Sequence, residues 1–180
     1  MNDNDVIAAL IVALRVGLDL KNLQNVLIKQ NYQPRDIGTP SQPTIFIHKI
    51  MADRYGFPSR KDVFNESTRL FDHTEAIWRT PTFQLDGLAT QDPANINSLT
   101  ASDIVEAAAD VLQSQAFRES LRVDCIGIQR ITSVRENYFT NDRERFQQNP
   151  SFDFILTYRP EWQSTVQPVN TYTFTTRPIC

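Results

Sequence analysis

The feature that most constrains the fold is a short segment, residues 152–159, in which side chains alternate in character. Large apolar residues occupy every second position from Phe152 to Tyr158, and polar residues hold most positions between them. A period of two is typical of a strand with one buried face. Pro150 and Pro160 bound the segment, because proline lacks the N–H that a strand ladder needs. We expect the rest of the chain to supply this strand with sheet neighbours and a helical cover.

Length and composition indicate one soluble domain spanning residues 1–180. The chain is 41% hydrophobic and 22% charged, which is ordinary for a globular protein. Its net charge of −3 argues against tight nucleic-acid binding by charge excess. Five glycines leave no phosphate-cradling loop or dinucleotide fingerprint. Two cysteines, Cys125 and Cys180, exclude a disulfide framework and a zinc quartet, and they fit a reducing compartment.

The N-terminal segment predicts a helix that runs to about Leu18. Asn2 or Asn4 can cap it, with acidic neighbours at its positive end. A broad apolar stripe leaves Val12 and Val16 outside it, so the helix should be buried on two sides. The second side could meet another subunit or a loop of the same chain, and both remain open. Since the start is acidic and the apolar run is short, we expect neither a signal peptide nor a membrane span.

The remaining patterns predict a sheet backed by a second helix. Thr100 resembles a helix cap, and apolar residues recur at helical spacing to about Phe117. A polar connection, residues 135–149, should form a projecting tip between two antiparallel strands. We therefore expect an α+β fold: a mostly antiparallel β-sheet with two helices packed on it and long projecting hairpin loops. Further strands are expected at residues 25–29, 44–51, 70–85 and 123–134, with an extended tail or edge strand at 167–176 inside a C-terminal tail of about residues 165–180.

A projecting arm is expected at about residues 52–70, where the strand pattern is interrupted by charges, a glycine and a proline. Long loops of this kind are usually functional or mobile. Aromatic and arginine side chains are common anchors of protein interfaces. We therefore interpret the arm as a contact with a neighbouring subunit or as part of a lumen. Its candidate residues are Arg54, Tyr55, Phe57, Arg60, Lys61 and Arg69.

No catalytic, cofactor or metal site is expected from the sequence. No serine lies in a nucleophile elbow, and no histidine, aspartate and glutamate cluster has metal-ligand spacing. His73 and Glu75 share a strand face, which is ordinary for an exposed pair. An alternative is a small metal-dependent nucleic-acid-processing enzyme using Asp124, Asp153 and Arg159, although none has a supporting acidic residue and lysine nearby.

Several segments of the C-terminal half resemble the tail terminator or gateway proteins of the tailed-phage neck. The similarity is carried by the helix at residues 104–117, the strand at 126–131 (IGIQRI), the connector at 145–150 (RFQQNP) and the strand at 151–159 (SFDFILTYR). These patterns cover about two-fifths of the chain closely, and the element order of the remainder agrees.

The resemblance implies a structural protein rather than an enzyme. It implies a ring, typically of six copies, that ends the tail, joins it to the head connector or adaptor and lets genomic DNA pass. The partners would be other copies of the chain, the connector above and the tail tube or sheath below. The protein would be assembled in the host cytoplasm and found in the virion. A tail-tube subunit or a head-completion adaptor is the alternative assignment within the virion.

Overall fold

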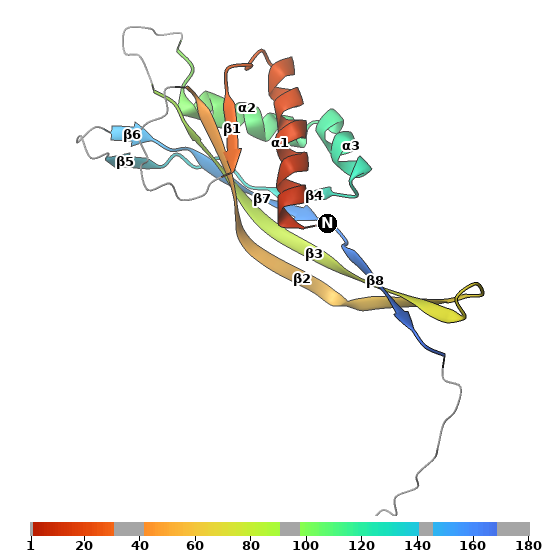
Figure 1. The fold of residues 1–180 in the computed structure, drawn as a ribbon. Helices are drawn as coiled ribbons and strands as arrows, with labels where there is room; N and C mark the ends of the chain where they lie inside the picture. Colours follow the sequence, from red (N-terminus) through yellow and green to blue (C-terminus); the bar gives the residue numbers. More distant parts are fainter. Residues whose placement is uncertain (1, 31–41, 91–97, 141–145, 169–180) are drawn as a thin grey trace, which may run out of the picture.

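The computed structural model describes residues 2–30, 42–90, 98–140 and 146–168 of the chain. Three helices gather on one side of an open sheet, and a long hairpin extends beyond them (Figure 1). The helices are α1 (Asp3–Leu20), α2 (Ala101–Gln113) and α3 (Gln115–Val123). The strands are β1 (Leu27–Gln30), β2 (Thr44–Asn65), β3 (Leu70–Leu88), β4 (Gly127–Ile131), β5 (Tyr138–Thr140), β6 (Phe146–Gln148), β7 (Ser151–Thr157) and β8 (Glu161–Val166).

Helix α1 begins and ends with local hydrogen-bonding motifs. The Asn2 side chain accepts from the backbone N–H of Asp5 at 2.9 Å, and the Asp5 carboxylate accepts from the Asn2 N–H at 2.7 Å. This reciprocal capping satisfies N–H groups that the first helical turn leaves free. At the other end Asn22 takes a positive φ of 62°, and the Leu23 N–H donates to the Leu18 carbonyl. The left-handed residue therefore turns the chain out of the helix.

The second predicted helix is two helices, because Ser114 interrupts it. Ser114 ends α2 in an extended conformation, and its side chain accepts from the Phe117 N–H to start α3. The predicted Thr100 cap is confirmed, with reciprocal bonds between Thr100 and Asp103. The strand expected from residue 123 is wrong at its start, since Val123 closes α3. Chain reversal follows at Cys125, which has a φ of 57°.

The sheet confirms the predicted α+β class. Its strand order is β1-β2-β3-β7-β4, with β8 also paired to β3. Of the strand pairs described, only β1 and β2 run parallel. The predicted strand at residues 152–159 is confirmed as β7, which lies between β3 and β4. A Cβ on Gly127 would lie 2.7 Å from the Thr157 side chain, so β4 and β7 approach closely at this glycine.

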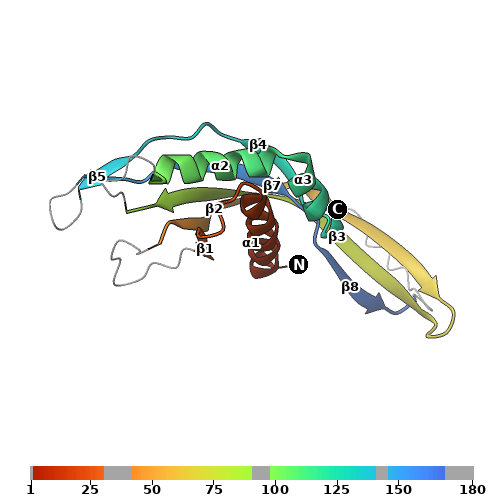
Figure 2. The same ribbon diagram turned by 90° about the horizontal axis from the view of Figure 1, so that it is seen from above.

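Strands β7 and β8 follow β3 in a single register. Asp86 pairs with Ser151 at one end of the ladder, and Phe71 pairs with Val166 at the other. Between them, Arg79 and Tyr158 form a bridge in the same register. Pro160 separates the two strands, as its missing N–H predicts. The ladder on β3 therefore runs from beneath the helices out along the hairpin, which both views show (Figure 2).

The core lies between the helices and the covered half of the sheet. Phe83 of β3 stacks on Phe154 of β7 with ring centroids 5.7 Å apart, and Tyr158 is 1% exposed. The Tyr158 hydroxyl donates to Asp3 at 3.2 Å, and Lys49 Nζ donates to the same carboxylate at 2.7 Å. The Lys49 hydrogen bond is the main cause that lowers the pKa of Asp3. Polar contacts thus fix the start of α1 to the sheet.

The arm predicted as a loop is regular structure instead. β2 continues as a strand to Asn65, and the turn to β3 occupies only residues 66–69. The sequence prediction was wrong because strand pairing with β3 overrides the local glycine, proline and charges. The predicted second tip has a small two-stranded sheet, β5 with β6, at its base. Residues 141–145 of that tip, residues 31–41 before β2 and the tail from residue 169 lie outside the described residues.

Candidate functional site

The first candidate surface is the distal hairpin, defined here as β2 from Ile50, the turn and β3 up to Thr80. Every β2 residue from Ile50 to Phe64 is exposed, and no helix lies over this region (Figure 1). β1 pairs with β2 only from Thr44 to Ile47, so the far edge of β2 has no partner strand among the described residues. An unpaired edge presents free backbone N–H and C=O groups to another chain.

A bulge in β2 displays an aromatic side chain at this edge. Tyr55 pairs with Trp78 and Ser59 with Ala76, so three β2 residues stand opposite one residue of β3. Gly56 has a φ of 72°, a conformation that glycine adopts without strain. Phe57 is 97% exposed and Tyr55 75%. A bulge interrupts the edge against continuous strand addition, and this one places a large apolar ring in solvent.

The charged candidates divide into paired and unpaired groups. Arg60 Nε lies 2.9 Å from a Glu75 oxygen, and His73 bridges Glu75 and Asp62. Hydrogen bonds to Asp62 and then Glu75 raise the pKa of His73, while the His73 hydrogen bond is the main cause that lowers the pKa of Glu75. Three candidates have no ion pair within the described part of the chain: Arg54, Lys61 and Arg69, the last with a φ of 53° in the turn.

All six predicted contact residues therefore lie on the distal hairpin. The sequence missed the element that braces it, because β8 has no buried face and no apolar alternation. β8 pairs with residues 71–76 of β3. Arg159, just before it, donates to the Ser59 hydroxyl and lies 6.0 Å from the Trp78 ring centroid. The third strand and this arginine stiffen the hairpin near the bulge.

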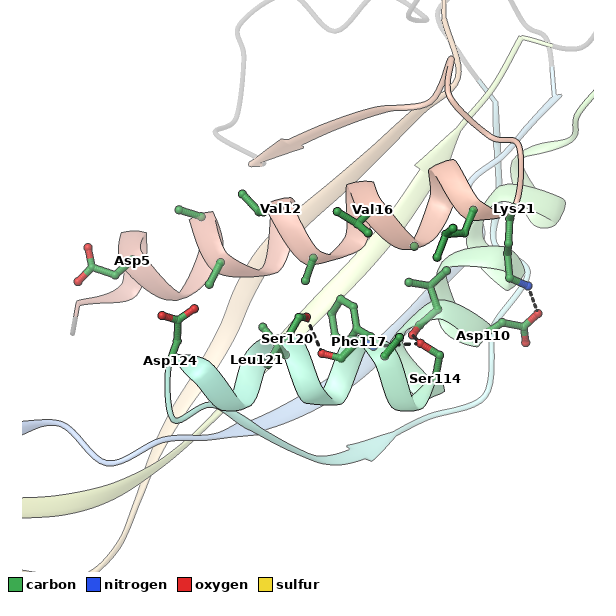
Figure 3. Close-up of a pocket in the computed structure, with 17 residues that line it drawn as sticks. Asp5, Val12, Val16, Lys21, Asp110, Ser114, Phe117, Ser120, Leu121 and Asp124 are labelled. Carbon is green, nitrogen blue, oxygen red and sulfur yellow. Dashed lines mark hydrogen bonds and ion pairs between the residues drawn. The ribbon is translucent and has the colours of Figure 1, made fainter.

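The second candidate surface is an apolar groove of about 630 Å³ between α1 and α3 (Figure 3). Small residues on α1, including Ala9, Ala13 and Gly17, make room for it, and Val12 and Val16 stand on its α1 side. Val12 is 65% exposed and Val16 is 58% exposed. The prediction that these valines fall outside the buried stripe is confirmed, and no described loop buries them. The sequence pattern gave no sign of the groove's other wall, which belongs to α3.

A partly buried ionisable pair, His48 of β2 and Asp86 of β3, lies on the sheet outside the distal hairpin. His48 Nδ1 and Asp86 Oδ1 are 3.3 Å apart. Neither atom has a well-aligned hydrogen-bond partner, so the contact is electrostatic. Burial raises the pKa of Asp86 to about 6, against the opposing effect of His48. We interpret the pair as part of the packing.

The structure gives the three nuclease candidates different neighbours. Arg135 donates to both carboxylate oxygens of Asp153 at 2.9 Å, while Asp124 follows α3 and lines the groove. Arg159 braces the hairpin. Within the described ranges, no group of three or more metal-ligating side chains gathers. No described helix is long and apolar enough to cross a membrane.

The structure thus combines a short helical layer on a sheet with a long braced hairpin. A solved structure described as an extracellular contractile injection system, PVC sheath/tube terminator in extended state, matches with a TM-score of 0.52 and 11% sequence identity. The match covers 100% of this chain and 65% of that chain, so this chain spans just under two thirds of its length. The class is that of tail-terminator-like proteins.

The chain belongs to the family described as E217 gateway protein gp29, whose model matches residues 5–168. Among curated proteins, no sequence match was found. The resemblance read from the C-terminal half is therefore confirmed, and it extends through the N-terminal half. Family and fold together make this a viral structural protein of the tail and neck.

Proposed function

We propose that this protein forms a ring in the neck of a tailed phage, where it ends the tail and joins it to the head connector while letting DNA pass. The observation that carries the proposal is the family match over residues 5–168, supported by the fold of a sheath/tube terminator. The whole chain acts as one structural domain with no catalytic site. Its partners are other copies, six in all, the connector or adaptor, and the tube or sheath.

The surfaces described above suit a ring. A closed ring uses a heterologous interface, in which one patch meets a different patch on the next copy. The distal hairpin and the groove are two such patches on one molecule. A lumen that passes DNA without gripping it should not be strongly basic, and the net charge of −3 is compatible with this.

The direct test is the mass and shape of the purified protein, together with its presence in virions. A single-layer ring with a central hole supports the proposal. A tail-tube subunit would instead polymerise into long filaments, and electron microscopy separates the two. A chain that stays monomeric and is absent from purified virions would refute the proposal. A protein that is monomeric in solution but forms its ring on a partner protein in the virion would not.

Charge reversal tests the hairpin within this function. In one variant Arg54, Arg60, Lys61 and Arg69 are each replaced by Glu. All four side chains are exposed, and among the described residues only Arg60 is in an ion pair, with Glu75, so the loss of folding stability should be small beside the loss of assembly. Assembly of infectious particles should fall, because the hairpin contacts a neighbour or borders the lumen. A control with four reversed charges on α2 and α3 would disturb folding. Asp103 caps α2 and Asp110 pairs with Lys21, so neither can be reversed without loss of a stabilising contact. Glu106→Lys, at an exposed position of α2, is the single-reversal control for Arg54→Glu alone. Normal particles from the quadruple variant would show that the hairpin assignment is wrong.

A further inference from the structure

The two candidate surfaces complement each other in shape. The groove is concave and apolar, with small side chains along α1 that leave room for an inserted ring. Phe57 is a large apolar side chain held out at a bulge, and at 97% exposure it is not seated in the groove of its own molecule. An isolated aromatic anchor that enters a pocket is the common arrangement at the centre of protein interfaces.

The two surfaces also complement each other in charge. Figure 3 shows Asp5 and Asp124 together at one end of the groove, and Lys21 with Asp110 at the other. Lys21 and Asp110 neutralise each other at 2.7 Å, whereas the Asp5 and Asp124 end has no cation paired to it among the described residues. Arg54 lies three residues before Phe57 and is likewise free of an ion pair in the described chain. The groove therefore has two carboxylates without a paired cation at one end, and the distal hairpin has an unpaired arginine three residues before Phe57.

We propose that the groove between α1 and α3 binds the bulge of an adjacent copy, with Phe57 inserted between the helices and Arg54 facing Asp5 and Asp124. The contact is heterologous, since each copy offers its hairpin to one neighbour and its groove to the other. Repetition of such a contact closes a ring when the rotation between copies allows it. The inference rests on the proposed function, because it requires copies on both sides.

Disulfide trapping tests the contact in the assembled protein. Both native cysteines are first changed to serine, Cys125→Ser and Cys180→Ser. One chain then carries Val12→Cys and another Phe57→Cys, and the two are mixed before assembly or co-expressed during infection. A heterologous contact predicts a disulfide-linked pair from the mixture and none from either chain alone. A chain carrying both substitutions should give a ladder of linked copies up to the full ring.

The matched controls also introduce cysteines, but at exposed positions outside the proposed contact. Glu106→Cys replaces Val12→Cys at an exposed α2 position outside the groove, and Val63→Cys replaces Phe57→Cys elsewhere on β2. Neither control mixture should cross-link efficiently. Phe57→Asp should also raise the concentration needed for ring formation at least about tenfold, whereas Phe57→Leu should have a smaller effect.

Three results would overturn the inference. Linkage of Val12→Cys chains to one another would mean that α1 meets α1 across a two-fold axis. Linkage of Phe57→Cys chains to one another would mean that hairpins meet each other. Rings or virions that contain the chains but give no linked pair would leave the proposed function standing and remove this contact. A chain that carries only Cys125→Ser and Cys180→Ser, and that neither forms rings nor enters virions, would instead count against the proposed function.

Discussion

The covered body and the distal hairpin share strands but are built differently. Within the body, β7 buries Phe152, Phe154 and Leu156 under the helices. In the distal hairpin, β2 buries no residue from Ile50 to Phe64 and is held by its ladder to β3 and by ion pairs. Burial of apolar area is the main source of stability. Substitutions in the body should therefore report on folding, and substitutions on the outer hairpin should report on contacts with other molecules.

The sharpest test compares two phenylalanines. Phe154→Ala should lower the free energy of unfolding by about 3–5 kcal/mol, because it removes a 1%-exposed ring stacked on Phe83. Phe57→Ala should change it by less than about 0.5 kcal/mol, since Phe57 is almost fully exposed. Chemical denaturation of both variants measures the difference. Similar losses from both would contradict the division between body and hairpin.

A second test compares two aspartates. Because the folded pKa of Asp86 is raised to about 6, the folded state binds this proton more tightly than the unfolded state does. The contribution of Asp86 to stability should therefore fall as pH rises from about 4 to about 6, while the lowered pKa values of Asp3 and Glu75 act in the opposite direction. Asp86→Asn should flatten this dependence and raise stability above pH 6 by roughly 1–3 kcal/mol. Asp53→Asn, on the exposed hairpin, should do neither. Denaturation curves between pH 4 and 8 give the comparison, and a less stable Asp86→Asn protein at pH 7 would show that the His48 contact outweighs burial.

Two glycines offer a third comparison. A Cβ on Gly17 would lie 2.2 Å from a Val111 methyl, so Gly17→Ala forces α1 and α2 apart. We expect a loss of about 1–3 kcal/mol from such overpacking. Gly56 has open space around it but a φ of 72°, so Gly56→Ala should cost only the left-handed strain, about 1 kcal/mol. Thermal melts rank the two, and amide exchange should place the Gly56→Ala effect in the hairpin alone.

The smallest effect concerns His73 in the distal hairpin. Its hydrogen bonds to Asp62 and Glu75 raise its pKa above the ordinary histidine value. The ion pairs therefore stabilise the hairpin while His73 is protonated and both carboxylates are ionised, and this contribution is lost as pH rises through the folded pKa of His73. NMR titration should find the raised value, and Asp62→Asn should lower it. An unchanged titration in Asp62→Asn would show that the Asp62 contact is absent in solution.

The sequence predicted the elements that bury a face. Strand β7, the start of α1 and the Thr100 cap follow from alternation and capping, which are local properties. Ser114 had the same local signal for a new helix, but the continuous apolar spacing around it concealed the break. The β3 side of the distal hairpin was predicted as a strand, but residues 52–65 of β2 were not, because neither face is buried there and glycine, proline and charges interrupt the local pattern.

The candidate surfaces divide in the same way. The residues Arg54, Tyr55 and Phe57 stood out because aromatic and cationic side chains cluster there. The exposed Val12 and Val16 followed from helical spacing. The groove itself depends on how α3 lies beside α1, and the bracing by Arg159 depends on the register of β8. Neither is a property of a short sequence window.

The single register along β3 has a mechanical consequence. β3 has 19 residues, so at about 3.3 Å each the strand is roughly 60 Å long, from its end beneath the helices to the hairpin turn. Ladder hydrogen bonds to β2 on one side and to β7 and then β8 on the other resist bending. A load applied at the turn is therefore carried inward as a torque on the strands that hold Phe83 and Phe154. The hairpin therefore behaves as a rigid lever arm and not as a flexible linker. Movement of a molecule bound at the hairpin turn must tilt the helix-covered body as well.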